Sequence, residues 1–99
     1  MQKKVFIYLK VSKPSLLHVQ EQVLTKYCKQ NDWQVVKAST DQEEMLEAAK
    51  GNEVDIVLVD SFTRISKDNA EIERLIDKLA LYNVILVSLT ESENIEGMN

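Results

Sequence analysis

The sequence predicts an α/β fold, a three-layer sandwich of flavodoxin-like type with a four-stranded parallel sheet of strand order 2-1-3-4. Short apolar runs rich in β-branched residues alternate along the chain with segments of helical periodicity. This alternation is typical of a parallel sheet with helices on both faces. The two most apolar runs, residues 5–11 and 54–59, belong in the centre of the sheet, which puts strand one beside strand three.

The first strand and the first helix meet at Pro14. The run before it is short and mostly β-branched or aromatic, which predicts a strand buried on both faces. Proline lacks the backbone N–H that a central strand needs, but it suits the first turn of a helix. Residues 14–30 follow with helical spacing, and we expect their buried face to contain Leu16, Val23 and Tyr27.

The second strand is predicted over residues 33–38, where Trp33 and two valines precede Lys37. Thr40 and Glu43 then match a capping box, with a hydroxyl at the N-cap and a glutamate three residues later. The helix that they begin is expected to end at Gly51, a residue common just beyond a helix end.

The third strand is predicted over residues 54–60, with an apolar centre that indicates burial on both faces. Residues 61–67 are predicted to form a loop. Asn83 is suited to a left-handed cap before the fourth strand, residues 84–89. The long helix between that loop and Asn83 is expected to bury Ile72, Leu75, Ile76 and Leu79.

Length and composition indicate one globular domain over residues 1–99, with a flexible tail from about residue 90. Cys28 is the only cysteine, so an intrachain disulfide is impossible, and we expect neither a metal site nor a cofactor. The first apolar run is too short for a signal peptide and is interrupted by Lys10. We therefore expect a cytoplasmic protein without contact to a membrane.

The net charge of −4 argues against broad non-specific binding to nucleic acid. The charge is unevenly distributed, however. Residues 1–37 contain seven lysines and two acids, whereas residues 38–60 contain seven acids and one lysine. A local basic patch is thus expected within an acidic protein, although ordinary solvated lysines explain the same pattern.

Four residues are predicted to converge at the carboxyl ends of strands one and three, where parallel sheets bind their ligands. They combine one hydroxyl with three cations: Ser12, Lys10, Arg64 and Lys67. Cations around a hydroxyl suit an anionic substrate such as phosphate. His18, the only histidine, lies within the first helix, which makes a Ser-His-Asp triad improbable. In the purely structural alternative, Ser12 caps the first helix and the cations are solvated.

Two motifs resemble the catalytic domain of the resolvase/invertase serine recombinases. Residues 8–12, Tyr-Leu-Lys-Val-Ser, resemble the Tyr-x-Arg-Val-Ser that opens that family. Residues 62–68, Phe-Thr-Arg-Ile-Ser-Lys-Asp, resemble its Leu-Asp-Arg-Leu-Ser-Arg-Asp. The helix around Gln20 and Gln22 resembles the glutamine-bearing first helix, and residues 84–98 resemble the last strand and the loop after it. The resemblance covers nearly the whole chain and implies a resolvase-like fold.

The resemblance implies that the protein has a role in DNA recombination or DNA integration, of the kind found in mobile elements. In that family the serine attacks a backbone phosphate, forms a phosphoserine link and releases a 3′ hydroxyl, while arginines hold the phosphate. Ser12 matches the nucleophile, and Lys10, Arg64 and Lys67 match arginine positions. The binding of phosphate or DNA is expected from these three cations and from Lys13.

The chain departs from the family at several positions. Lys10 and Lys67 replace arginines, Thr63 replaces an aspartate, and residues 33–60 contain no arginine to match another active-site arginine. Lysine lacks the planar fork that binds phosphate bidentately. The 99 residues are also expected to lack the family's long dimerising helix and its helix-turn-helix domain.

We therefore expect a resolvase-like domain that is inactive alone, or that regulates an intact recombinase by binding it. As a protein it is expected to be a monomer or a weak homodimer that binds DNA weakly. One alternative is a weakly active, Ser12-dependent DNA strand transferase that works with a partner. A second is a receiver-like signalling domain in which Asp60 accepts phosphate, although Leu9 and Lys10 stand where that chemistry needs an acidic pair.

Overall fold

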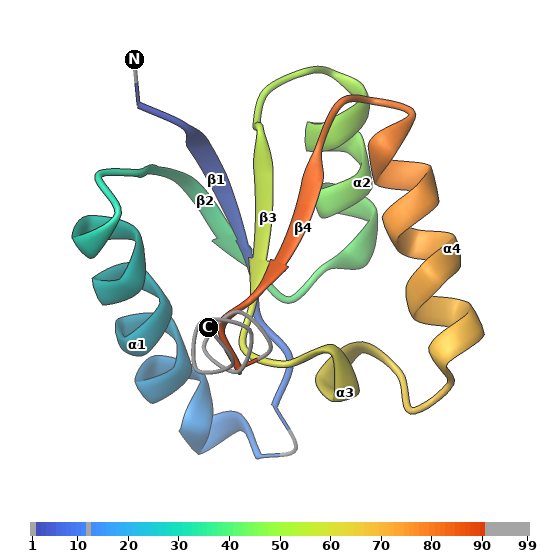
Figure 1. The fold of residues 1–99 in the computed structure, drawn as a ribbon. Coiled ribbons are helices and arrows are strands. Elements are labelled where there is room, and N and C mark those ends of the chain that lie inside the picture. Colours follow the sequence, from blue (N-terminus) through green and yellow to red (C-terminus); the bar gives the residue numbers. More distant parts are fainter. Residues whose placement is uncertain (1, 12, 91–99) are drawn as a thin grey trace, which may run out of the picture.

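The computed structural model describes residues 2–11 and 13–90. Its strands are β1 (Lys4–Tyr8), β2 (Gln34–Ser39), β3 (Ile56–Val59) and β4 (Ile85–Ser88). They form one sheet of order β2-β1-β3-β4 in which every neighbouring pair is parallel (Figure 1). The predicted fold class and strand order are confirmed.

Helices cover both faces of this sheet. The three long ones are α1 (Leu17–Gln30), α2 (Gln42–Lys50) and α4 (Asn69–Ala80), and two short ones are the 3-10 helix η1 (Pro14–Leu16) and α3 (Phe62–Ile65). Figure 1 shows α1 on one face and α2 with α4 on the other. No helix in the described part of the chain is long and apolar enough to cross a membrane.

The two central strands form the best-buried part of the molecule. In β1, residues Val5, Phe6 and Ile7 have no exposed surface, and all four residues of β3 are buried. Their parallel register pairs Val5 with Ile56 and Ile7 with Leu58. Because the strands run side by side in the same direction, both chains leave the sheet at the same carboxyl edge (Figure 1).

Three polar residues with positive φ turn the chain from a helix into the following strand. They are Asp32, Asn52 and Asn83, at φ values of 58°, 57° and 61°. Asn and Asp tolerate this left-handed conformation better than other non-glycine residues do. The cap predicted at Asn83 is therefore confirmed, and Gly51 is the C-cap of α2 as expected.

Two local predictions are wrong. The N-cap of α2 is Asp41 rather than Thr40, and its carboxylate accepts a hydrogen bond of 2.9 Å from the Glu43 N–H. Aspartate is the stronger N-cap residue of the two. The loop predicted over residues 61–67 contains the short helix α3, because the Ser61 hydroxyl caps it by accepting from the Thr63 N–H.

The prediction of the buried helix faces is correct for three of the four residues on α4, and it is wrong for Leu16 and Val23 of the first predicted helix. Ile72, Leu75 and Leu79 are buried, although Ile76 is 37% exposed. On α1 the buried residues are Gln20, Leu24 and Cys28, and Tyr27 is half-buried. The apolar residues Leu16, at the end of η1, and Val19 and Val23 of α1 are 42%, 54% and 46% exposed. We call these last three residues the α1 stripe.

The sheet geometry explains why the α1 stripe is uncovered. Four strands span about 19 Å, whereas one helix is about 10 Å wide. On the opposite face, α2 and α4 share the sheet, but α1 is alone and packs on β1 and β2. Ile85 of β4 points to the same face as α1, because it is paired with Ile56, and it is 64% exposed. One face therefore retains apolar surface that a lone helix cannot cover.

We expect Leu75→Ala to lower the free energy of unfolding by about 2–5 kcal/mol, because it removes a buried side chain and leaves a cavity. Ile76→Ala on the same helix is the matched control and should cost much less, because that side chain is partly exposed. Urea denaturation followed by circular dichroism measures both. Equal losses from the two substitutions would contradict this assignment of the α4 faces.

Candidate functional site

Lys10 lies at the carboxyl edge, just beyond the buried end of β1. Its ammonium Nζ donates a hydrogen bond of 3.2 Å to the carbonyl oxygen of Ile65, the last residue of α3. This bond joins the segment after β1 to the segment after β3. Two of the predicted cations, Lys10 and Arg64, thus belong to neighbouring segments, since Arg64 directly precedes Ile65 in α3.

Gln20 of α1 holds the backbone of Lys10 from the other side. Its side-chain nitrogen donates to the Lys10 carbonyl, and its side-chain oxygen accepts from the Lys10 N–H, both at 3.1 Å. Gln20 is buried, so these two bonds satisfy polar groups that have little access to water. The sequence indicates only that the helix around Gln20 and Gln22 resembles the family's first helix. A polar residue on the buried face of a helix was the signal for this contact.

Arg64 forms an ion pair with Asp60, the residue that follows β3. The distance from Arg64 Nε to Asp60 Oδ2 is 3.7 Å, and both side chains are partly exposed. The two residues line a groove of about 200 Å³ together with Gln20 and a row of apolar side chains, Val11, Leu16, Val19 and Val23. The charged site and the α1 stripe therefore share one groove.

The remaining predicted residues are less tightly held. Lys13 is exposed at the N-cap of η1, and Lys67 is exposed between α3 and α4. Ser12, the predicted nucleophile, lies outside the described residues, so its proximity to Arg64 or Lys67 stays a prediction. Lys13 and Leu16, rather than Ser12, occupy the N-cap positions of η1 and α1, and neither side chain caps its helix.

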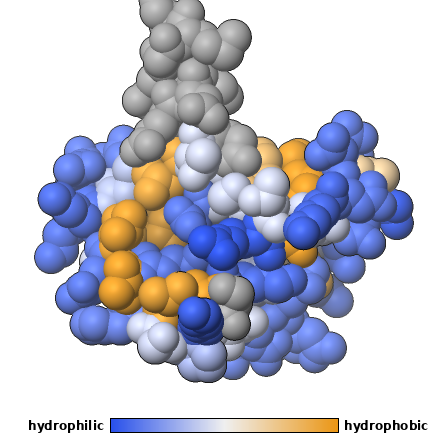
Figure 2. All heavy atoms as spheres, turned by 90° about the horizontal axis from the view of Figure 1, so that it is seen from below, coloured by the Kyte–Doolittle hydropathy of each residue, from blue (hydrophilic) through white to orange (hydrophobic). Residues whose placement is uncertain are grey.

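Figure 2 looks onto the carboxyl edge of the sheet. A band of apolar surface runs beside a strongly hydrophilic centre on this side of the molecule. The charged pair Asp60 and Arg64 supplies polar groups here, and the α1 stripe supplies apolar ones. A ligand at this edge therefore meets positive charge and apolar surface together.

Two other potential nucleophiles remain protonated at neutral pH. Burial raises the pKa of the Cys28 thiol to about 11. Burial, and to a lesser extent the Asp41 carboxylate, also raises the pKa of the Tyr8 hydroxyl. Within residues 2–11 and 13–90, no three His, Cys, Asp or Glu side chains are grouped so that they could hold a metal ion.

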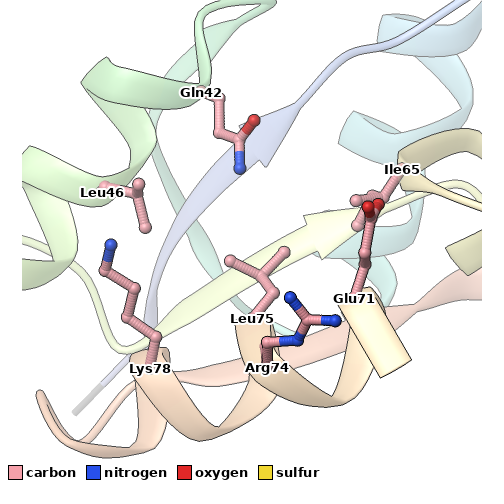
Figure 3. A pocket seen from close by; sticks show the side chains of 7 residues that line it. All are labelled: Gln42, Leu46, Ile65, Glu71, Arg74, Leu75 and Lys78. Atoms are coloured by element: carbon pink, nitrogen blue, oxygen red, sulfur yellow. The ribbon is translucent and has the colours of Figure 1, made fainter. Parts of the chain in front are cut away.

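A larger cavity, of about 430 Å³, lies between α2, α3 and α4. Figure 3 shows that Arg74 and Lys78 of α4 extend along it, with Gln42 and Leu46 of α2 on the other wall. Glu71, Leu75 and Ile65 complete the lining. None of the predicted site residues lines this cavity, whereas Arg64 lines the smaller groove. We therefore place the candidate site at the smaller groove, where the segments after β1 and β3 meet.

Comparisons with known proteins agree on one family. The family model described as "Resolvase, N terminal domain" matches residues 5–99. The chain is similar to the crystal structure of the N-terminal catalytic domain of TP901-1 integrase, with a TM-score of 0.82 and 28% identity over 91% of this chain and 79% of that one. No match was found among curated proteins.

Two further crystal structures share the fold at lower identity. One is a resolvase family site-specific recombinase from Streptococcus pneumoniae, with a TM-score of 0.80, 21% identity, and coverage of 91% of this chain and 74% of that one. The other is the C-terminal catalytic domain of ISC1926 TnpA, an IS607-like serine recombinase, with a TM-score of 0.78, 20% identity, and coverage of 87% and 68%. These two establish a likeness of fold.

We expect Gln20→Leu to lower the free energy of unfolding by about 1–3 kcal/mol, because it leaves backbone groups of Lys10 without partners. It should also accelerate hydrogen exchange at the Lys10 amide. Gln22→Leu is the matched control, because Gln22 is an exposed glutamine of the same helix. Unchanged protection of the Lys10 amide in Gln20→Leu would show that the contact does not hold this segment.

Proposed function

We propose a function for this chain from one premise: the chain belongs to the family of resolvase N-terminal domains. Its proposed function is to bind the phosphate backbone of DNA weakly through the carboxyl edge of the sheet. We propose further that it does not cleave DNA by itself and that it regulates an intact serine recombinase by binding to it.

One observation carries the proposal for DNA. Lys10 and Arg64 follow different strands, yet the bond from Lys10 Nζ to Ile65 O brings their segments together. A phosphodiester carries one negative charge, and two cations on neighbouring segments suit its binding. Lys13 and Lys67, exposed at the same edge, add positive charge for the neighbouring phosphates.

The chemistry that such a site would perform is transesterification. The Ser12 oxygen would form a bond to phosphorus while the bond from phosphorus to the 3′ oxygen breaks. The hydroxyl proton would leave Ser12, and the departing 3′ oxygen would gain a proton. The number of phosphate ester bonds is unchanged, so the step needs neither an oxidant nor a nucleotide cofactor. Its rate depends on cations that stabilise the charge developing on the phosphoryl oxygens.

Those cations are poorly suited to catalysis in this chain. Lys10 already donates to Ile65 O, and Arg64 is already paired with Asp60. Lysine at positions 10 and 67 offers a point charge instead of the planar fork of arginine. The loss of one preorganised donor costs about 100- to 1000-fold in rate. The two lysine replacements and the missing arginine together are therefore expected to reduce cleavage below detection, whereas the remaining positive charge still supports binding.

We expect the purified chain to leave supercoiled plasmid intact and to form no covalent adduct with it. Ser12→Ala is the control, because it removes the proposed nucleophile and leaves the cations in place. Gel electrophoresis after protease treatment measures nicking, and mass spectrometry detects an adduct. An adduct formed by the wild-type chain and absent from Ser12→Ala would establish the alternative, a Ser12-dependent strand transferase.

The α1 stripe supports the proposed binding to a recombinase. Leu16 of η1 and Val19 and Val23 of α1 leave about half of their surface exposed, and Ile85 adds apolar surface on the same face of the sheet. Contiguous exposed apolar surface marks sites of protein association more often than scattered apolar residues do. An association through this face would cover the groove that contains Arg64 and Asp60.

We expect the wild-type chain to form a complex with a full-length serine recombinase of the same organism. Val23→Glu should weaken it by about tenfold or more, because association would bury a carboxylate without a partner. Val36→Glu is the matched control, since Val36 is 45% exposed but lies on β2. Sedimentation velocity of the mixtures measures the affinities. Equal effects of the two substitutions would rule out the α1 stripe as the contact.

A further inference from the structure

The ion pair between Asp60 and Arg64 is held in place at both ends. The Asp60 carbonyl oxygen accepts hydrogen bonds from the Thr90 N–H, the Thr90 hydroxyl and the Ser88 hydroxyl, at 3.1, 3.0 and 3.3 Å. The Arg64 N–H donates to the Ser61 carbonyl at 3.0 Å within the capped helix α3. The backbones that bear the two charges are therefore anchored, which places the carboxylate within reach of the guanidinium.

The ion pair with Asp60 uses only one of the three guanidinium nitrogens of Arg64. An arginine side chain has five N–H donors, and the contact to Asp60 is made at Nε. The two terminal nitrogens still present a fork that fits two phosphate oxygens. A phosphate bound there would lie near the Asp60 carboxylate, so each of its negative charges would be attracted by Arg64 and repelled by Asp60.

We propose that Asp60 weakens the binding of doubly charged phosphomonoesters at this site more than that of singly charged phosphodiesters. The inference rests on the proposed function, in which Arg64 meets backbone phosphate. Phosphates inside a DNA strand are diesters, whereas free nucleotides and strand ends carry monoesters. A carboxylate beside the binding fork repels the second charge of a monoester as well as the first, and it thereby offsets the preference of Arg64 for the more highly charged strand ends.

The size of the effect follows from Coulomb's law. Two unit charges about 6 Å apart in water interact with an energy equal to about a threefold change in a binding constant. Both side chains are partly exposed, so the value for water applies. Removal of the Asp60 charge should therefore strengthen binding of a monoanion about threefold and that of a dianion about tenfold.

The experiment compares dimethyl phosphate with methyl phosphate, which differ by one methyl group and one charge. At about pH 8 the monoester is doubly charged, because its second pKa is near 6. Titrations of the full chain are followed by the NMR signal of Arg64 Nε–H. Asp60→Asn should raise the affinity for methyl phosphate about three times more than that for dimethyl phosphate.

Asp77→Asn is the matched control, because it makes the same change of charge at an exposed position of α4. It should leave the ratio of the two affinities unchanged. If Asp60→Asn changed the affinities for both anions by the same factor, or weakened both, the proposed effect of Asp60 would be overturned. Binding of dimethyl phosphate would in that case still support the proposed function. If neither anion shifts the NMR signal of Arg64 Nε–H in any variant, both the proposed phosphate site and the proposed effect of Asp60 are wrong.

Discussion

The parallel pairing of β1 with β3 is the constraint on which the rest of the structure depends. Both strands are buried on both faces, so they can lie only in the middle of a covered sheet. Because they are neighbours and run in the same direction, the chain segments that follow them leave the sheet side by side. Lys10 follows β1, and Asp60 and Arg64 follow β3. The candidate site is therefore a consequence of how the core is buried.

The carboxyl edge is built from short contacts that hold backbone as well as side chains. Gln20 binds both backbone polar groups of Lys10, and the Asp60 carbonyl accepts three hydrogen bonds from Ser88, the last residue of β4, and from Thr90 beyond it. Bonds of this kind set the positions of the backbone segments that bear the charged side chains, which reduces the cost of ordering these segments when a ligand binds. The proposed binding of phosphate without cleavage rests on this ordered backbone.

The uneven cover of the sheet links the fold to the proposed partner. Two helices share one face, whereas α1 alone lies on the other and packs on β1 and β2. The α1 stripe is the apolar surface that remains, and it lines the same groove as Arg64. Association through the stripe would thus change access to the charged groups beside it. Binding of a protein and binding of phosphate are therefore expected to affect each other at this edge.

The sequence by itself determined the fold class, the strand order and the convergence of Lys10 with the Arg64 segment. These follow from apolar runs that must be buried and from the directions that parallel crossovers impose. Only the tertiary structure decided which face of α1 is buried, because Val19 and Leu24 are both apolar and only the packing of α1 on β1 and β2 distinguishes them. It also decided that Gln20 holds Lys10 and that Asp60 pairs with Arg64. Such contacts depend on side-chain positions within a few ångströms, which periodicity and spacing along the chain do not specify.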